Sequence, residues 1–498
     1  MSERTDIIIS NIPELYNQSG AVLKALTKSK REVYQIEGVI SRIRHIESGA
    51  RIEPLTQDGL RYEISQSVCC LKRKTYADGR EVLFEVDPPM GVVRDALASA
   101  EIPLPPIAGI VSHPLISENG KIIYCAGYNP DTLFYVAAPE EILKAARGVP
   151  IAPNVAEVSE AVALIGEVAI DIPFATEADR ANYFAAFLTM LNRPLIKGPT
   201  PIILIESSTQ GTGKTLTGES IIKINTGRPA VPTAWSSDEE ELKKTIHSML
   251  ISGNEYIFID NVNGKIGSGT LASVVTSGSL NSRILGFSKM VSAPCNAIII
   301  ITANNPDVSR EIARRCVPIK LVTDLENPAE RTGFKHPDLD SFIMENRAEL
   351  IKAGLVMIRA WFANECDTSG VKVLGSFEAW SRTIGGILKS CGIKGFLENT
   401  ADFFSLSDGD AENWGAFLGA WYKEHTNSPV MVRDILPLAR EYGLVDEKRP
   451  EGSQKKSLGR VMLKKRDVVF GGIKVTRASF RSGNLTWKAI KTEGGEQK

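Results

Sequence analysis

The stretch from Pro201 to Thr215 constrains the fold more than any other part of the chain. It begins with a short apolar run, Ile202–Ile205, of the kind that forms a buried parallel strand. A turn of small residues follows, and the next segment, from Leu216 to Lys223, has the character of a helix. Strand, glycine-containing turn and helix N-terminus is the order of a phosphate-binding loop. The sequence therefore predicts an α/β fold that binds a phosphate group.

Single residues of this loop have separate tasks. Gly211 and Gly213 would let backbone N–H groups surround an anion, because a Cβ would block the close approach. Lys214 would reach the β- and γ-phosphates of ATP, and the Thr215 hydroxyl would coordinate Mg²⁺. The full set of expected nucleotide-binding residues is Gly211, Thr212, Gly213, Lys214, Thr215 and Leu216.

The loop departs from the strict motif at one position. G-x-x-x-x-G-K-[ST] requires glycine where this chain has Ser208. Serine can enter the same turn at some conformational cost, and Gly211 can share the task. The alternative is a surface loop that contains Gly-Lys-Thr by coincidence, and the flanking strand and helix argue against it.

A second apolar strand, Tyr256–Asp260, ends in an acid, which would lie beside Mg²⁺ at the carboxyl edge of the sheet. Asn261 follows where many ATPases of this class have glutamate, and asparagine cannot take a proton from water. The acids close enough in sequence to act instead are Glu206, Glu240 and Glu241, of which Glu241 is preferred. A charged helix N-terminus at residues 238–241 is an equally good interpretation.

A third buried strand, Ala297–Thr302, leads to Asn304 and Asn305. A polar side chain there could orient the attacking water or contact the γ-phosphate. Arg314 and Arg315 then follow a predicted helix. They could simply satisfy its C-terminal carbonyl groups. The preferred interpretation is that one of them reaches across a subunit boundary as an arginine finger.

Length and charge distribution limit the class of protein. At 498 residues the chain is too long for one core, and roughly three domains are expected. The net charge is only −1, but Lys448–Lys491 contains thirteen Lys and Arg residues against two acids. Such asymmetry favours a nucleic-acid partner. Neither an apolar stretch of membrane-spanning length nor a secretory signal is visible, so we expect a cytoplasmic protein without a membrane partner.

The basic C-terminal segment has the order helix, helix, β-hairpin, which is typical of a winged helix. Its cations on or beside the second helix are Lys455, Lys456, Arg460, Lys464 and Lys465. We expect them to contact DNA. A solvated basic face, or a module that docks on another protein, is the alternative.

The chain divides into five expected regions. They are an N-terminal α+β accessory domain at 1–150, a helical linker region at 151–195, the ATPase core at 196–325, a helical lid at 326–425 and the winged helix at 426–498. A structural or docking role is favoured over catalysis for the first of them.

Four segments together resemble the core of AAA+ ATPases. They are Gly211–Thr215, Ile257–Asn261, Thr302–Asn305 and Arg310–Arg315, in this order and spacing. More narrowly, the chain resembles the helicase-like ATPases of prophages, genomic islands and cassette chromosomes, which are related to minichromosome-maintenance and superfamily 3 helicases. The resemblance covers roughly residues 105 to 490. An Asp-Asn pair such as Asp260-Asn261 is usual in these relatives.

The resemblance implies a ring, commonly a hexamer, with ATP and Mg²⁺ at the subunit interfaces. Lys214 would contact the phosphates, and Thr215 and Asp260 would bind the metal ion. Asn304 would be the sensor residue, with Asn305 as the alternative. Arg314 or Arg315 would be the arginine finger. The element from Arg283 to Ser292 corresponds to a hairpin in the ring channel. Lys289 near its tip would grip a phosphate of single-stranded DNA, assisted by Arg283.

These expectations converge on an ATP-dependent DNA helicase or translocase that acts in the replication of a mobile genetic element. A separate primase or polymerase would act with it, since we see no primase motif in the chain. One alternative is a DNA-binding AAA+ initiator or loader that switches with nucleotide without translocating. Another is a protein-remodelling ATPase whose winged helix only docks.

Overall fold

The computed structural model describes residues 4–9, 15–47, 49–283, 290–323, 325, 328–405, 409–447, 449–481 and 484–492. The chain forms two compact units. The first comprises Met1–Gly264, Ser268–Pro306 and Arg315–Thr400, and the second comprises Lys265–Gly267, Asp307–Arg314 and Ala401–Lys498.

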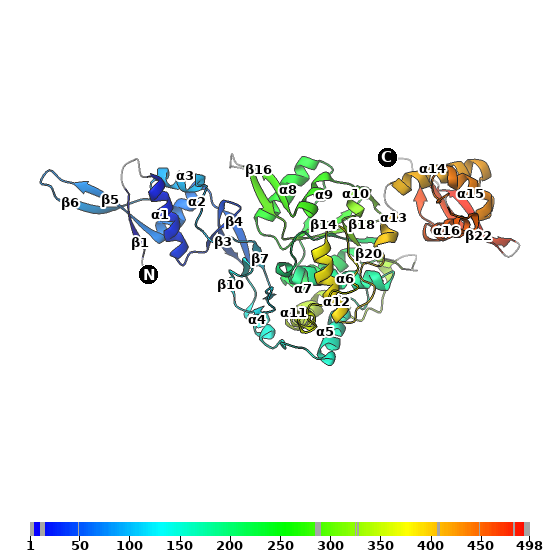
Figure 1. Cartoon of the computed structure of the whole chain (residues 1–498), viewed down its shortest axis with the longest axis horizontal. Coiled ribbons are helices and arrows are strands. Elements are labelled where there is room, and N and C mark those ends of the chain that lie inside the picture. The colour runs from blue at the N-terminus through cyan, green and yellow to red at the C-terminus, as the bar shows by residue number, and fades with distance from the viewer. Residues whose placement is uncertain are drawn as a thin grey trace. The chain divides into compact units, whose positions relative to one another are not determined.

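The centre of the first unit is a five-stranded parallel sheet (Figure 1). Its strands, in spatial order, are β13 (Pro232–Thr233), β14 (Tyr256–Val262), β18 (Ile298–Asn304), β12 (Ile202–Ser207) and β20 (Cys316–Leu321). The three middle strands are rich in isoleucine because helices cover both faces of a parallel sheet. The strand before the loop, β12, therefore adjoins β18, and β18 separates it from β14.

Helices around this sheet carry or support the expected site. They are α6 (Glu177–Leu191), α7 (Lys214–Thr226), α8 (Glu239–Ile251) and α9 (Gly269–Ser277). Helix α7 lies so close to the sheet that a Cβ on Gly218 would come within 2.8 Å of the Phe258 ring. Between α9 and β18, the strands β16 (Ser279–Arg283) and β17 (Met290–Pro294) form an antiparallel pair.

A second layer of helices packs on this core. It consists of α4 (Glu140–Arg147), α5 (Val155–Val168), α11 (Leu339–Ala363) and α12 (Glu378–Ser390). The long helix α11 contacts α4, α5, α7 and α12, and Gly354 on it allows close approach to Leu191. The region expected to be a lid thus begins with a helix that rests directly on α7.

The N-terminal part of the first unit has its own small core. Helices α1 (Leu15–Lys28), α2 (Gln57–Ser67) and α3 (Met90–Ala98) pack on the sheet β1 (Thr5–Ile8), β5 (Val68–Thr75) and β6 (Glu81–Val86). The turn at 77–80 joins β5 to β6. The remaining strands of this part are β2 (Val33–Ile36), β3 (Val39–Ile46), β4 (Gly49–Pro54), β7 (Gly109–Val111), β8 (Leu115–Ile116), β9 (Ile122–Ile123), β10 (Gly127–Tyr128) and β11 (Phe134–Val136).

The second unit has a core of large aromatic residues. Its main elements are α14 (Gly409–His425), α15 (Val432–Glu441), α16 (Glu451–Lys464), β21 (Val469–Phe470), β22 (Ile473–Arg481) and β23 (Asn484–Lys491). Trp414, Phe417 and Trp421 of α14 are buried in the same cluster as Leu458 and Trp487. Helix α14, which the sequence analysis places in the lid, therefore belongs to the C-terminal core.

Shorter elements complete the two units. They are α10 (Arg310–Ala313), α13 (Thr400–Ser405), β15 (Lys265–Ile266), β19 (Asp307–Val308) and the 3-10 turns at Arg193–Leu195 and Pro328–Glu330. Among the helices that the structure describes, none is long and apolar enough to cross a membrane.

Candidate nucleotide-binding site

Polar side chains from α7, β14 and β18 meet at the carboxyl edge of the central sheet. Thr215 Oγ1 donates a hydrogen bond of 2.8 Å to Asp260 Oδ1, although the two residues are 45 positions apart. Asn304 Nδ2 donates to Asn261 Oδ1 at 3.1 Å. These contacts arise because β14 and β18 are neighbours and α7 packs against both strands.

Thr302 links the two halves of this cluster. Its hydroxyl donates to Asp260 Oδ1 at 2.6 Å and accepts from the backbone N–H of Asn261 at 2.7 Å. The side chain is fully buried. Sequence reasoning assigned Thr302 no role. The available signal was a hydroxyl group at the end of a run of isoleucines.

The loop itself holds the Lys214 ammonium group. Lys214 Nζ donates to Ser207 Oγ at 2.9 Å and to the carbonyl oxygen of Thr209 at 3.3 Å. Ser207 Oγ also lies 2.6 Å from Thr212 Oγ1. Burial lowers the pKa of Lys214, and the nearby Asp260 carboxylate opposes that shift. A cation is thus kept inside the loop by neutral oxygen atoms that an anion can replace.

The departure at Ser208 has a backbone explanation. Gly211 and Gly213 have φ values of +77° and +90°, in the left-handed region that favours glycine. Ser208 is not among the residues with positive φ. The conformational demand of this loop therefore falls on the two glycines that the chain retains. Leu216, in the first turn of α7, is 42% exposed and borders the space beside the loop.

Asn304 and Asn305 occupy different surroundings. Asn305 has φ of +41°, and its backbone N–H donates to the Ser207 carbonyl at 2.9 Å. The amide of Asn304 reaches Asn261, and its Oδ1 atom is buried without a hydrogen-bond partner in the described part of the chain. An unsatisfied buried acceptor is costly, so this atom is suited to a ligand or water donor.

The expected acids lie elsewhere. Glu240 and Glu241 are exposed in the first turn of α8, where their backbone N–H groups bond to the Asp238 side chain. Burial raises the pKa of Glu206, and its charged neighbours are Lys320 and Asp179. Among the residues that the structure describes, no hydrogen bond or ion pair joins these acids to Asp260.

A different acid, Glu219, has Asp260 among its charged neighbours. It lies one helical turn after Thr215 on α7, so both side chains project from one face. Burial raises the pKa of Glu219, and the carboxylates of Asp340 and Asp260 act in the same direction. Sequence reasoning missed this residue, although its i+4 spacing from Thr215 was visible.

The two arginines after α10 have separate partners. The Arg314 side chain is exposed, with its guanidinium carbon 5.1 Å from the centre of the Phe404 ring. Arg315 is partly exposed and donates from Nε to Thr276 Oγ1 at 2.8 Å. Neither arginine is buried within its own chain.

A cavity of about 420 Å³ adjoins the loop. Its lining includes Gly211, Leu216, Ile172, Pro173, Phe334 and His336. The volume lies within the ordinary range of small-molecule sites. It offers space for an apolar ring next to the place where phosphates would be held.

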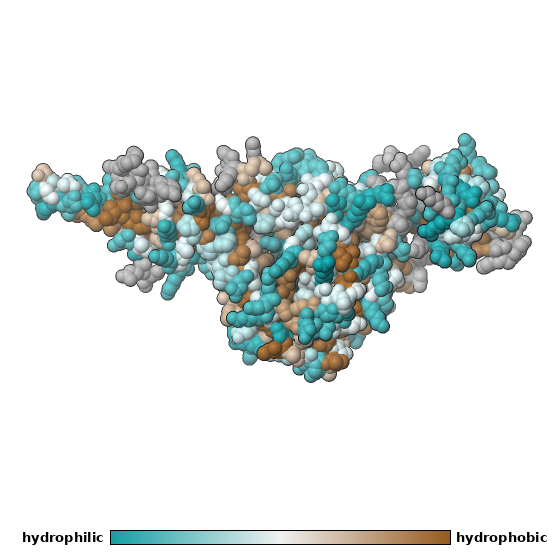
Figure 2. Space-filling view, viewed as in Figure 1, coloured by the Kyte–Doolittle hydropathy of each residue, from teal (hydrophilic) through white to brown (hydrophobic). Residues whose placement is uncertain are grey.

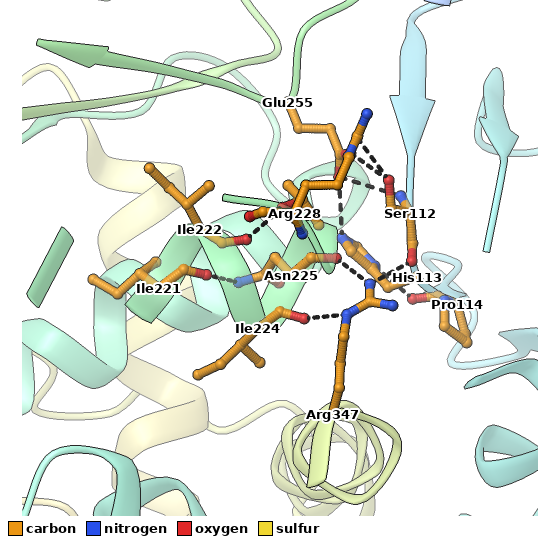
Figure 3. A network of polar contacts seen from close by, with 11 residues as sticks. Ser112, His113, Pro114, Ile221, Ile222, Ile224, Asn225, Arg228, Glu255 and Arg347 are labelled. Atoms are coloured by element: carbon orange, nitrogen blue, oxygen red, sulfur yellow. Dashed lines mark hydrogen bonds and ion pairs between the residues drawn. The ribbon is translucent and has the colours of Figure 1, made fainter. Parts of the chain in front are cut away.

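The far end of α7 is anchored by Arg347 of α11 (Figure 3). Its guanidinium group donates to the carbonyl oxygens of Ile224 at 2.9 Å and of Asn225 and Ser112 at 2.7 Å. The last carbonyl groups of a helix lack partners within it, so a cation there stabilises the helix. Burial lowers the pKa of Arg347 to about 10.

The same network reaches the central sheet through Glu255, just before β14. Glu255 accepts from Ser112 Oγ at 2.8 Å and lies 3.2 Å from an Arg228 nitrogen (Figure 3). Burial raises the pKa of Glu255, while Arg228 acts against that shift. The helix that carries the loop is therefore held to its surroundings at both ends.

The expected DNA-contacting residues are spread over the chain. Arg283 is the last residue of β16 and is paired in register with Met290. Lys289, the expected tip residue, lies outside the described residues.

On α16 the basic residues differ in exposure. Lys456 and Arg460 are exposed one turn apart, and Lys455 pairs with Glu451 at 2.5 Å. Lys464 is the last residue of the helix. The following Lys465 is buried against the rings of Trp414 and Phe470, so it belongs to the core.

Comparisons with known proteins add weak similarities. Neither a family model nor a curated protein sequence matches this chain. A solved apo structure, the A form of the NrS-1 C-terminal region, shares 13% identity over 95% of this chain and 99% of that chain, with a TM-score of 0.42. A structure described as the active helicase Cch of SCCmec type IV shares 10% identity over 93% and 98%, with a TM-score of 0.27.

Proposed function

We propose that this chain is an ATPase with an AAA+ type core, which binds Mg²⁺-ATP at the loop before α7. The observation that carries the proposal is the contact between Thr215 and Asp260, with Lys214 held in the adjoining loop. A hydroxyl, a carboxylate and a lysine that converge at a helix N-terminus fit a nucleotide phosphate chain.

The donor set also fits the metal ion. Mg²⁺ is usually bound by one or two protein oxygens together with phosphates and water. Thr215 Oγ1 and the Asp260 carboxylate are such oxygens, and Thr302 would hold the carboxylate in place. When bound, the ion would neutralise charge on the phosphates.

The remaining residues of the site would have the following tasks. Lys214 would bind the β- and γ-phosphates, and the backbone N–H groups from Gly211 to Leu216 would surround them. Asn304 would use its unsatisfied Oδ1 to orient the attacking water. The Glu219 carboxylate is a candidate for the base that takes up the proton of the attacking water. Glu241, which the sequence pattern favours for the same task, is the second candidate.

We infer that the active form is a ring, with Arg314 or Arg315 completing the site of a neighbouring copy. The exposure of Arg314 supports this role, because a finger must be free to cross a subunit boundary. A hexamer is the ring size that the family resemblance implies.

DNA is the proposed substrate of the motor. The exposed cations Lys456 and Arg460 on α16 support DNA binding by the C-terminal unit as a winged helix. The paired strands β16 and β17 support a channel hairpin. The proposed activity is therefore DNA unwinding or translocation in the replication of a mobile element.

A forked-duplex assay tests this activity. The full chain should unwind a fork with ATP, and Lys214→Ala should abolish both hydrolysis and unwinding. Lys244→Ala, an exposed lysine on α8, is the matched control and should behave as the wild type. Hydrolysis that DNA stimulates without any unwinding would instead identify a nucleotide-switched initiator or loader.

A further inference from the structure

The strands β5 and β6 continue as a two-stranded ribbon beyond the N-terminal core (Figure 1). Strand β1 pairs with β5 only as far as Leu71. From Lys72 outward, β5 pairs with β6 alone, down to the pair of Thr75 with Glu81. A ribbon of this kind has two open faces, and its side chains alternate between them.

The register assigns the side chains of the ribbon to its faces. Lys72 is opposite Phe84, Lys74 is opposite Val82, and the backbone N–H of Tyr76 bonds to the Arg80 carbonyl. Directly opposed residues of antiparallel strands share a face. We call this set the basic ribbon face: Lys72, Lys74, Tyr76, Arg80, Val82 and Phe84. It contains three cations and two aromatic rings, and no acid.

The opposite face of the ribbon is balanced in charge. On this face Arg73 forms an ion pair with Glu81 at 3.2 Å, and Arg4 forms one with Glu85 at 2.6 Å. The excess of positive charge is therefore confined to the basic ribbon face. The alternation of side chains between the faces does not by itself explain this excess, because both faces belong to the same two strands.

The side chains of the basic ribbon face are available to a partner. Tyr76, Val82 and Phe84 are 43%, 44% and 41% exposed. Figure 2 shows hydrophilic and hydrophobic surface side by side on the ribbon, at the left of the view. Exposed aromatic rings gain nothing from the core of their own chain, so contact with another molecule is the stabilisation open to them.

The cations on this face are arranged around Tyr76. Lys74 Nζ lies 5.0 Å from the centre of the ring, and the Arg80 guanidinium carbon lies 5.9 Å from it. Arg80 also pairs with Asp78 of the turn at 2.7 Å. Lys72 and Lys74 form no ion pair with a described carboxylate. Two uncompensated ammonium groups thus flank exposed rings.

We propose that the basic ribbon face binds single-stranded DNA. Its lysines would contact successive phosphates, and Tyr76 and Phe84 would stack on unpaired bases. A polyanion matches the charge of this face, and stacking requires bases that are not already paired. A second copy of the chain presents the same cations on this face, so self-association through it would bring like charges together.

Binding of a labelled oligothymidine to the full chain without nucleotide tests the proposal. Tyr76→Ala combined with Phe84→Ala should weaken binding tenfold or more, since each stacked base is worth about 1–3 kcal/mol. Lys72→Gln combined with Lys74→Gln should reduce the salt dependence of the logarithm of affinity by about 0.7 per lysine. The control, Arg73→Gln with Glu81→Gln, changes the opposite face without changing net charge and should match the wild type.

Photo-crosslinking with iododeoxyuridine oligomers gives a second readout that other DNA contacts do not obscure. The cross-linked peptide should span residues 72–84. Unchanged affinity and salt dependence together with no cross-link in this peptide would overturn the proposal. A change in oligomeric state by light scattering, with DNA affinity intact, would also overturn it and would identify a contact between copies.

Discussion

The Thr302 hydroxyl donates a 2.6 Å hydrogen bond to Asp260 Oδ1, the same atom that accepts from Thr215 at 2.8 Å. Two donors to one oxygen restrain the orientation of the carboxylate. Thr302 lies on β18 and Asp260 on β14, so the pairing of adjacent strands sets the orientation of the proposed metal ligand. Thr302 acts as a positioning residue in this arrangement.

Replacing Thr302 by valine preserves shape but removes both hydrogen bonds. We expect hydrolysis to fall by about 10–100-fold, which is the usual effect of losing a group that orients a metal ligand. The Mg²⁺ concentration for half-maximal rate should rise as well. Thr302→Ser retains the hydroxyl and should restore most of the activity. Equal Mg²⁺ dependence in the valine variant and the wild type would contradict the positioning role.

The glycine pattern of the loop gives a second prediction. Gly213 has φ of +90° and open space where a Cβ would lie, so Gly213→Ala tests backbone strain rather than a clash within the chain. It should destabilise the protein by about 1–2 kcal/mol and weaken nucleotide binding. Ser208→Gly, which completes the strict motif, should change nucleotide affinity little. A large gain in affinity from Ser208→Gly would show that serine strains the loop. Thermal unfolding and nucleotide titration measure both effects.

His113 predicts how stability depends on pH. Its ring is fully buried, and burial lowers its pKa from 6.5 to about 4, with Arg347 acting in the same direction. Between these pH values the unfolded chain therefore binds more protons than the folded chain does. The stability that the folded protein gains from keeping this ring neutral is lost as pH falls from 6.5 to 4. At 1.36 kcal/mol per unit, the loss is about 3 kcal/mol.

Comparison of His113→Gln with the wild type isolates this effect. The raised pKa of Glu255, 3.8 Å from the His113 ring, acts in the opposite direction and is present in both proteins. Denaturant unfolding should show a flatter acid dependence for the variant. Parallel curves would mean that His113 is protonated in the folded state.

Arg314 can be tested with a control from its own surroundings. Arg310 contacts the same Phe404 ring, at 5.4 Å, so Arg310→Ala removes a neighbouring cation of similar setting. We expect Arg314→Ala to lower hydrolysis by about 10³-fold or more, and Arg310→Ala to have a small effect. Mixing the Arg314→Ala and Lys214→Ala proteins should restore activity. An interface that takes Lys214 from the first variant and Arg314 from the second contains both residues and is therefore an intact site. Failure to restore it would argue against a finger acting between copies, and Arg315→Ala would then be the next variant.

The sequence indicates the parts of this fold that depend on local chemistry. The isoleucine-rich strands, the turn with Gly211 and Gly213, and the helix from Lys214 each follow from residue type and spacing within a few positions. Pairing of β18 between β12 and β14 does not follow from local pattern, because it is set by long-range packing. Thr302 was therefore overlooked, since its role depends on which strands are neighbours.

The boundary of the C-terminal unit shows a second limit. Trp414 and Trp421 of α14 are buried in the C-terminal core. The sequence did not indicate which core they would join, because an amphipathic helix between two helical regions can pack on either. Similarly, the basic character of Lys465 suggested a DNA contact, whereas two aromatic rings cover it.

The most direct test of the proposed nucleotide site is a titration with a fluorescent ATP analogue in Mg²⁺. Lys214 Nζ is held by loop oxygens that phosphates are expected to replace, so the wild type should bind the analogue and Lys214→Ala should bind it at least tenfold more weakly. Lys244→Ala should bind as the wild type does. Undiminished affinity in Lys214→Ala, with the variant folded as judged by thermal unfolding, would contradict the assignment of this loop to the phosphates.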